Sequence, residues 1–286
     1  MNVYEIVTAR IIEALNQGTA PWKKCWSSRR PRNPFSGKDY RGVNVLLLQA
    51  QPFKSHQWMT FNQAQSVGGF IKTRERGTPV VFYKVTEREQ SDGTTKKGCI
   101  LRYFTVFNLE QTEGVPLVSS VEEKRTIDPI AACENIVAGF ANPPSIIHGG
   151  DRACYNPSMD RIQVPSRDRF SSSENYYSTM FHELAHSTGH QTRLSRKGVT
   201  DASRFQIHGY AFEELVAEIA NAFLCSSAGI APTTLDNSAA YIASWMKALK
   251  SEPRWIIEAS AQASKAAELI LGKAHGKIEE SVQEAA

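Results

Sequence analysis

Apolar residues recur at helical spacing near the start of the chain. They are Val3, Ile6, Val7, Ile11, Ile12 and Leu15. Residues three and four positions apart lie on one face of a helix, and Gly18 follows as a stop signal. The pattern predicts a helix over residues 3–15.

Two later runs have the character of β-strands. Residues 79–85 and 99–107 are rich in β-branched and aromatic side chains, and the stretch between them, TEREQSDGTTKKG, is charged and contains glycine. This pattern predicts a hairpin with a long exposed tip. The first half is therefore expected to be a small domain with a helix and a β-hairpin or sheet.

The second half is mostly helical in pattern. Ser171 with Glu174 three residues later is a capping-box signature, which predicts a helix running through residues 176–187 and stopping at Gly189. Further helices are predicted over residues 129–140, 210–225, 239–250 and 255–271, and a strand, a turn and a second strand over residues 154–165. The fold class predicted for the chain is α+β.

Length and composition predict two domains. A chain of 286 residues can bury one large core or two modest ones. Aromatic density falls at residues 115–128, before the next helical pattern. We therefore predict a first domain over residues 1–118, a linker over 119–128 and a second domain over 129–286.

Charge divides the two halves. Residues 1–118 hold 17 Lys and Arg against 9 Asp and Glu, or +8, and the remainder hold 16 against 20, or −4. No run of apolar residues is long enough to span a membrane and the start does not resemble a secretion signal, so a cytoplasmic protein without a membrane partner is expected. The five cysteines form no CxxC pair, which argues against a disulfide framework or a thiolate zinc cluster.

The sequence His182-Glu183-Leu184-Ala185-His186 lies within a predicted helix. The two imidazoles are one turn apart on one face, so they can hold a single tetrahedral Zn²⁺ ion, although another divalent metal is possible. Glu183 is rotated about a hundred degrees round the helix. We predict that Glu183 does not bind the metal but holds the attacking water and takes its proton.

A second predicted helix supplies the remaining groups. Glu214 is the predicted third ligand, and Glu218, one turn further, is predicted to accept a hydrogen bond from a ligand histidine. Glu213 faces another direction and is the alternative ligand. Tyr210 and His208 are both candidates to donate to the oxyanion that forms on attack.

Two other interpretations of this motif remain open. The histidines can be ordinary polar residues on an exposed helix, or the ion can be structural and the site without catalytic activity. Glu183 discriminates between the last case and a hydrolase, because a structural site needs no base.

The basic half interleaves cations with aromatic rings. Trp22, Lys23, Lys24, Trp26, Arg41 and Trp58 are the residues of this kind that we predict to bind DNA. Cations that follow the phosphates and rings that stack on unpaired bases suit single-stranded DNA. A core of aromatic residues beneath a solvated basic surface is the alternative.

Along essentially its whole length, the chain resembles the ArdC family of plasmid and phage antirestriction proteins. In the first half the resemblance is carried by residues 18–26, 33–44, 58–64 and 106–108, and in the second by residues 155–165, 181–194 and 210–224. The first half is similar to the family's single-stranded-DNA-binding domain, which also occurs in conjugative primases, and the matched segment 40–44 adds Asn44 to the predicted DNA-binding residues. The second half is similar to the family's zincin-like domain.

The resemblance implies an antirestriction protein that binds single-stranded DNA and protects incoming plasmid or phage DNA from host restriction. A zinc-dependent metallopeptidase activity is expected from the motif, with a host restriction enzyme or another protein as its substrate. Two alternatives remain: a non-catalytic protein that binds DNA or the restriction enzyme and uses zinc to brace its fold, and a primase accessory factor.

Overall fold

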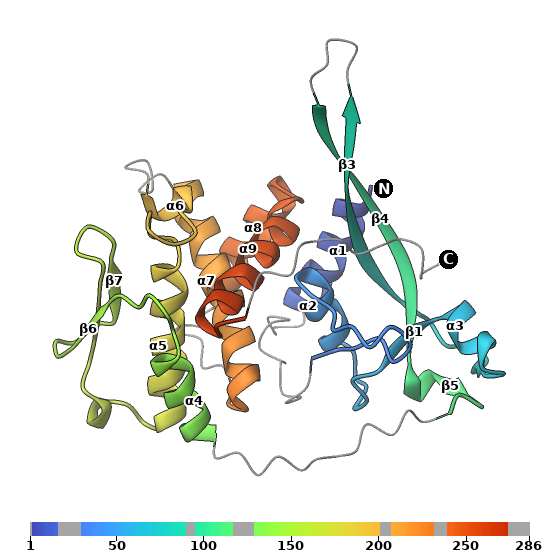
Figure 1. Ribbon diagram of the computed structural model, residues 1–286, viewed down its shortest axis with the longest axis horizontal. Helices are drawn as coiled ribbons and strands as arrows, with labels where there is room; N and C mark the ends of the chain where they lie inside the picture. Colours follow the sequence, from blue (N-terminus) through green and yellow to red (C-terminus); the bar gives the residue numbers. More distant parts are fainter. Residues whose placement is uncertain are drawn as a thin grey trace.

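The computed structural model describes residues 2–16, 30–89, 95–116, 129–200, 207–231 and 239–273. The first half contains a hairpin that projects from the body of the molecule, and the second half is built mainly from helices (Figure 1). Helices and sheets are therefore both present, and the predicted α+β class is confirmed.

Helix α1 (Val3–Asn16) forms where the apolar spacing predicted it. Val7, Ile11 and Leu15 are almost fully buried, as expected for one face of an amphipathic helix. The short helix α2 (Val43–Gln49), which the pattern did not predict, is nearly all apolar and is buried along most of its length.

The predicted hairpin is present but longer than expected. Strands β3 (Thr78–Glu89) and β4 (Thr95–Asn108) pair in antiparallel register from Thr78 opposite Val106 to Glu89 opposite Thr95. Much of the charged stretch predicted as a loop is therefore strand. Antiparallel pairing uses backbone groups, so a polar sequence does not by itself end a ladder.

The other elements of the first half surround this hairpin. Strand β1 pairs with the far edge of β4, which gives the order β1-β4-β3, while β2 and β5 form a small separate sheet. These elements are β1 (Trp58–Thr60), α3 (Phe61–Ser66), β2 (Phe70–Ile71), the 3-10 turn η2 (Leu109–Gln111) and β5 (Thr112–Glu113).

The second half combines a small sheet with a group of helices. Its elements are α4 (Pro129–Ala138), β6 (Ser145–His148), β7 (Cys154–Asn156), β8 (Arg161–Val164), η3 (Arg167–Arg169), α5 (Ser173–Ser187), α6 (Lys197–Thr200), α7 (Ile207–Ala228), α8 (Ala239–Ser251) and α9 (Trp255–Ile270). The predicted helices and the antiparallel β7–β8 pair are confirmed. Strand β6, which was not predicted, lies parallel to β8.

Helix α5 begins one residue later than the capping-box pattern suggested. The N-cap is Ser172, whose hydroxyl accepts a hydrogen bond from the backbone N–H of Asn175 at 3.2 Å. The hydroxyl of Ser171 instead accepts from the side-chain amide of Asn175. Two adjacent serines offered two possible registers, and the sequence pattern favoured the wrong one.

The buried core runs through both halves of the chain. Helix α1 packs against α8 and α9, and helix α2 packs against α9 (Figure 1). Buried residues of all four helices belong to one apolar cluster. Thr8 Oγ1 donates to the carbonyl of Pro253 at 2.7 Å, and the N–H of Gly42 donates to Ser264 Oγ at 3.1 Å. The predicted linker 119–128 lies outside the described residues, so the domain boundaries stay predictions.

Within the described residues, no helix has both the length and the apolar character needed to cross a membrane.

Candidate metal centre

Helix α5 brings the two histidines of the motif together in the interior. His182 and His186 lie one turn apart, and their Nε2 atoms are 3.1 Å from each other. Phe181, Leu184 and Ala185 are fully buried, so the other faces of the helix are fixed in the core. The packing of α5 therefore fixes the direction of both imidazoles.

Glu214 reaches the same point from helix α7. Its Oε2 lies 3.5 Å from His182 Nε2, and its Oε1 lies 3.5 Å from His186 Nε2. Helices α5 and α7 pack directly against each other. One ligand atom from each of the three residues lies within 4.8 Å of the other two.

These three side chains fit a divalent metal ion. Two imidazole nitrogens bound to one tetrahedral Zn²⁺ ion, each about 2.05 Å from it, are roughly 3.3 Å apart, close to the separation of the two Nε2 atoms here. Two histidines and one glutamate are a set found in catalytic zinc sites, where a fourth position stays open. The donors and their spacing are therefore those of a metal site.

A carboxylate lies behind each histidine. Glu218 Oε1 is 3.4 Å from His182 Nδ1, where the sequence placed a carboxylate that orients a ligand histidine. Glu213 Oε1 is 3.4 Å from His186 Nδ1. Glu213, considered from sequence only as an alternative ligand, thus lies on the side of His186 away from the three ligand atoms.

Sequence reasoning missed Arg196. Its guanidinium is buried, and its Nε donates to Glu213 Oε2 at 3.0 Å. Further donations to Thr188 Oγ1 and to the carbonyl of Ala185 fix Arg196 against the end of α5. No local pattern signals this pair, because Arg196 and Glu213 are 17 positions apart in the sequence.

Gly189 allows the chain to turn back toward this arginine. A Cβ atom added there would overlap the side chain of Val199 and would lie 3.1 Å from Nη2 of Arg196. Only glycine accommodates this approach without displacing its neighbours.

Electrostatics within the site favour a bound cation. Burial by itself would lower the pKa of His186, but the carboxylates of Glu213 and Glu214 outweigh it and raise this pKa to about 10. The pKa of His182 is raised in the same way, against burial, chiefly by Glu214. The pKa of Glu214 is lowered although burial would raise it, because both histidines contact its carboxylate.

For the other predicted catalytic residues, the structure gives the helix on which each lies and, for two of them, the exposure. Glu183 follows His182 on α5 and is buried. Tyr210 lies on α7 one turn before Glu214 and is 57% exposed. His208 lies in the first turn of α7, and its side chain is not among the described parts of the structure. The catalytic roles of all three stay predictions.

Four of the predicted DNA-binding residues, Trp22, Lys23, Lys24 and Trp26, lie outside the described residues. Arg41 is described and half exposed, and its Nε lies 3.5 Å from Glu268 Oε1 of helix α9. A DNA phosphate would therefore have to compete with this carboxylate for Arg41.

Asn44 and Trp58 are buried. The Asn44 amide donates to the carbonyl of Val81 at 2.8 Å and accepts from the N–H of Val81 at 2.7 Å, so it joins α2 to β3. The Trp58 side chain is 2% exposed and belongs to the small core beneath the hairpin. We therefore revise both predictions: neither side chain is presented on the surface for direct stacking or base contacts.

Comparison with known families divides the chain into two matching parts. Residues 1–107 match the N-terminal domain of the anti-restriction factor ArdC, and residues 132–262 match the zincin-like metallopeptidases. The class defined by the fold and the site is thus a zincin-like metallopeptidase domain preceded by an ArdC-type N-terminal domain. A metal cofactor is implied by this class.

Whole-chain comparisons identify the family. The crystal structure of the antirestriction protein ArdC from plasmid R388 in its metal-free form is 37% identical, with a TM-score of 0.76 over 94% of this chain and 97% of that one. Its Mn(II)-bound structure gives a TM-score of 0.77 at the same identity, over 95% of this chain and 98% of that one. The chain belongs to the ArdC family of antirestriction proteins.

Two further relatives widen this picture. A DNA primase TraC of Escherichia coli is 38% identical over 99% of this chain, but the match spans only 28% of the primase. An uncharacterized protein of Sinorhizobium fredii, y4eC, is 32% identical over 93% of this chain and 91% of its own length. The chain therefore spans about a quarter of the primase that it matches.

Proposed function

We propose that this chain is a cytoplasmic antirestriction protein that binds single-stranded DNA through its first half and carries a catalytic zinc centre in its second half. It would protect incoming plasmid or phage DNA from host restriction. The convergence of His182, His186 and Glu214 in the interior, within a chain of the ArdC family, is the observation that carries this proposal.

His182, His186 and Glu214 would hold the metal. A bound divalent ion supplies a Lewis acid that polarises a carbonyl group and lowers the pKa of a water molecule. Two imidazoles and a carboxylate favour Zn²⁺. The Mn(II)-bound relative makes Mn²⁺ a second candidate for this chain.

Each remaining residue then has a distinct task. Glu183 accepts the proton of the attacking water at its carboxylate, for which its place beside His182 is suited. Glu213 hydrogen-bonds to Nδ1 of His186, and Glu218 lies 3.4 Å from Nδ1 of His182. These carboxylates would hold each ring with its Nε2 toward the ligand point. Tyr210 or His208 would donate to the developing oxyanion.

A restriction assay in cells tests the proposal. Unmethylated DNA is introduced into a restricting host that produces the intact protein, Glu183→Gln, or Glu258→Gln, an exposed glutamate on α9 that serves as the matched control. We expect loss of protection with Glu183→Gln alone, at an unchanged amount of folded protein. Full protection by Glu183→Gln would instead favour a binding protein in which the metal braces the fold.

The match to DNA primase TraC gives a second candidate function. A chain that matches part of a primase can assist primer synthesis on single-stranded DNA without containing the primase active site. Stimulation of primer synthesis by the full chain, unchanged in Glu183→Gln, would favour this accessory role over antirestriction.

A further inference from the structure

A buried polar turn, residues 108–111, holds the neighbouring loop 52–57 by hydrogen bonds. In the turn η2 and the residue before it, Asn108 and Gln111 are almost fully buried. Asn108 Nδ2 donates to the carbonyl of Ser55 at 2.8 Å, and Glu110 Oε1 accepts from the N–H groups of Lys54 and Ser55 at 2.6 Å each. Residues 52–57 are thereby held in a defined conformation.

The same turn anchors a second, basic loop over residues 72–76. Gln111 Nε2 donates to Glu75 Oε2 at 2.8 Å and to the carbonyl of Arg76 at 3.0 Å, while Lys72 Nζ donates to the carbonyl of Glu110 at 2.8 Å. Arg74 has a φ of 69°, which is uncommon for a residue other than glycine and occurs often at functional sites. The loop presents three exposed cations, Lys72, Arg74 and Arg76.

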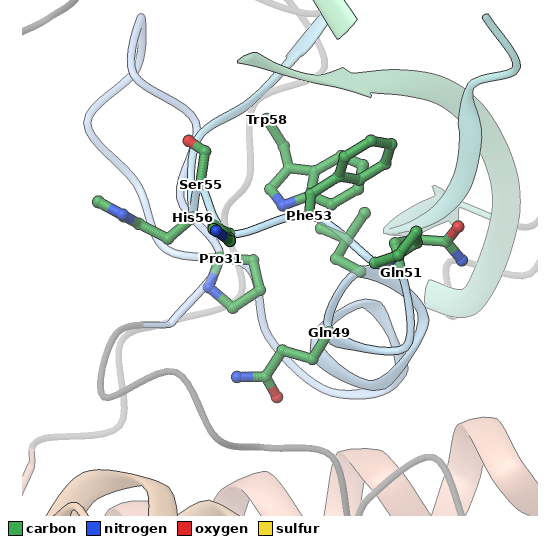
Figure 2. Close-up of a pocket in the computed structure, with 10 residues that line it drawn as sticks. Pro31, Gln49, Gln51, Phe53, Ser55, His56 and Trp58 are labelled. Carbon is green, nitrogen blue, oxygen red and sulfur yellow. The ribbon is translucent and has the colours of Figure 1, made fainter. Parts of the chain in front are cut away.

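The first of these loops borders a cavity of about 270 Å³. The rings of Phe53 and Trp58 lie on one side of it and Pro31 and Gln49 on the other (Figure 2). Phe53 meets Trp58 edge to face, with ring centroids 5.6 Å apart and planes at 74°. Trp58 therefore supports Phe53 from the core, and the partly exposed Phe53 ring is the aromatic surface that a ligand can reach.

Gln49 also lines this cavity, and its side-chain amide is buried and turned away from the two rings (Figure 2). Within the part of the chain that the structure describes, neither its Oε1 nor its Nε2 has a hydrogen-bond partner, although both atoms are buried. An unpaired buried amide is costly. A rotation of the side chain would let this donor and acceptor meet the polar edge of a planar ring system in the cavity.

We infer that this cavity takes one unstacked base of a single DNA strand, whose neighbouring phosphates follow Lys54 and Lys72. The inference rests on the proposed binding of single-stranded DNA. Both lysines belong to loops that contact Glu110, so the cations and the ring are held by one turn. The cavity lies just below the range of about 300–1,000 Å³ for whole small-molecule sites, which suits one base better than an entire nucleotide.

Binding of two oligonucleotides of equal length to the full chain tests this inference. One is oligo-dT and the other carries only abasic positions, so both present the same phosphates. Fluorescence anisotropy at several salt concentrations gives the affinity for each. The variants are Phe53→Ala, Phe53→Leu, Lys54→Ala and Lys72→Ala, with Lys250→Ala on α8 as the control for an exposed lysine, and circular dichroism checks that each is folded.

We expect the intact protein to prefer oligo-dT, and both Phe53 variants to lose about fivefold or more of that preference, because a base stacked on an aromatic ring contributes measurably. Because Phe53→Leu keeps an apolar side chain of similar size, a lost preference for oligo-dT in this variant cannot be assigned to unfolding. Lys54→Ala and Lys72→Ala keep the preference but each lower the slope of log affinity against log salt by about 0.7. Lys250→Ala changes neither quantity.

Three results would overturn the inference in distinguishable ways. Tight binding of oligo-dT with an unchanged preference in both Phe53 variants removes the base pocket but leaves single-stranded DNA binding intact. No binding of either oligonucleotide removes the proposed DNA-binding function as well. Free dTMP is included as a competitor: competition at concentrations comparable to those of oligo-dT would assign the cavity to a free nucleotide and contradict a strand as its ligand.

Discussion

The two halves of the molecule hold their polar residues in different ways. In the second half, the predicted ligands converge on one point and carboxylates lie behind both histidines. In the first half, Asn44 and Trp58 are buried, and three exposed cations, Lys72, Arg74 and Arg76, lie on one anchored loop. The candidate metal centre thus lies in the interior, whereas the proposed DNA contacts would come from loops that the interior supports.

The largest expected effect is on the buried ion pair behind His186. Arg196→Met leaves Glu213 without its arginine partner in the interior, and breaking such a pair costs about 3–5 kcal/mol of unfolding free energy. Urea denaturation of the metal-free protein measures it. Arg169→Met, in an exposed pair with Asp151, is the matched control and should cost no more than about 1 kcal/mol. Equal losses of unfolding free energy in the two variants would show that the buried Arg196–Glu213 pair stabilises the fold no more than an exposed pair does.

A smaller effect, on metal affinity, is expected from Glu218, which contacts the ligand His182 but is not itself a predicted ligand. Glu218→Gln removes the charge behind His182, and loss of such a supporting contact typically lowers metal affinity by about 10- to 100-fold. Competition with a chelating dye measures the affinity, and Glu258→Gln is the control. Unchanged affinity in Glu218→Gln would mean that the carboxylate does not help to orient His182.

In the first half, Asn44 is expected to stabilise the fold without contacting DNA. Asn44→Ala removes two buried hydrogen bonds to Val81, which we expect to lower the unfolding free energy by about 2 kcal/mol. Its affinity for oligo-dT, measured well below the unfolding temperature, should match that of the intact protein. A stable variant with weakened DNA binding would return Asn44 to the DNA-contacting residues.

The smallest expected effect is a pH dependence at the turn between β7 and β8. Burial would raise the pKa of Asp160, but hydrogen bonds from Arg193 and Tyr155 and the charge of Arg193 lower it below its ordinary value of 3.8. A lowered folded pKa adds stability above the ordinary value, and that stability is lost as the pH falls through the folded pKa. The melting temperatures of the intact protein and Asp160→Asn should therefore differ in full above the ordinary pKa of 3.8 and converge as the pH falls through the lowered pKa of folded Asp160. A constant difference would contradict this.

Local patterns account for what could be predicted from sequence. The spacing of His182 and His186 and the apolar stripe of α1 depend only on helical periodicity, and both were predicted with nearly correct bounds. Strand ends were less predictable, because the charged part of the hairpin pairs through its backbone.

What could not be predicted depends on contacts between distant segments. Arg196 reaches Glu213 only after the chain turns at Gly189, and no spacing rule links the two. Phe53 and the turn at Glu110 are likewise joined by tertiary hydrogen bonds of loop 52–57. Trp58 belongs to an aromatic-rich motif, but composition could not show whether its ring would lie inside or outside.

Metal titration of the metal-free full chain tests whether His182, His186 and Glu214 bind a metal ion. Isothermal titration with Zn²⁺ and with Mn²⁺ is compared for the intact protein, His186→Ala and His190→Ala. His190 lies four positions after His186, beyond the end of α5, and hydrogen-bonds to Thr192. We expect one tight site per chain in the intact protein and in His190→Ala, and its loss in His186→Ala. Equal binding by all three proteins, or none by the intact chain, would contradict the assignment of His182, His186 and Glu214 as the metal centre.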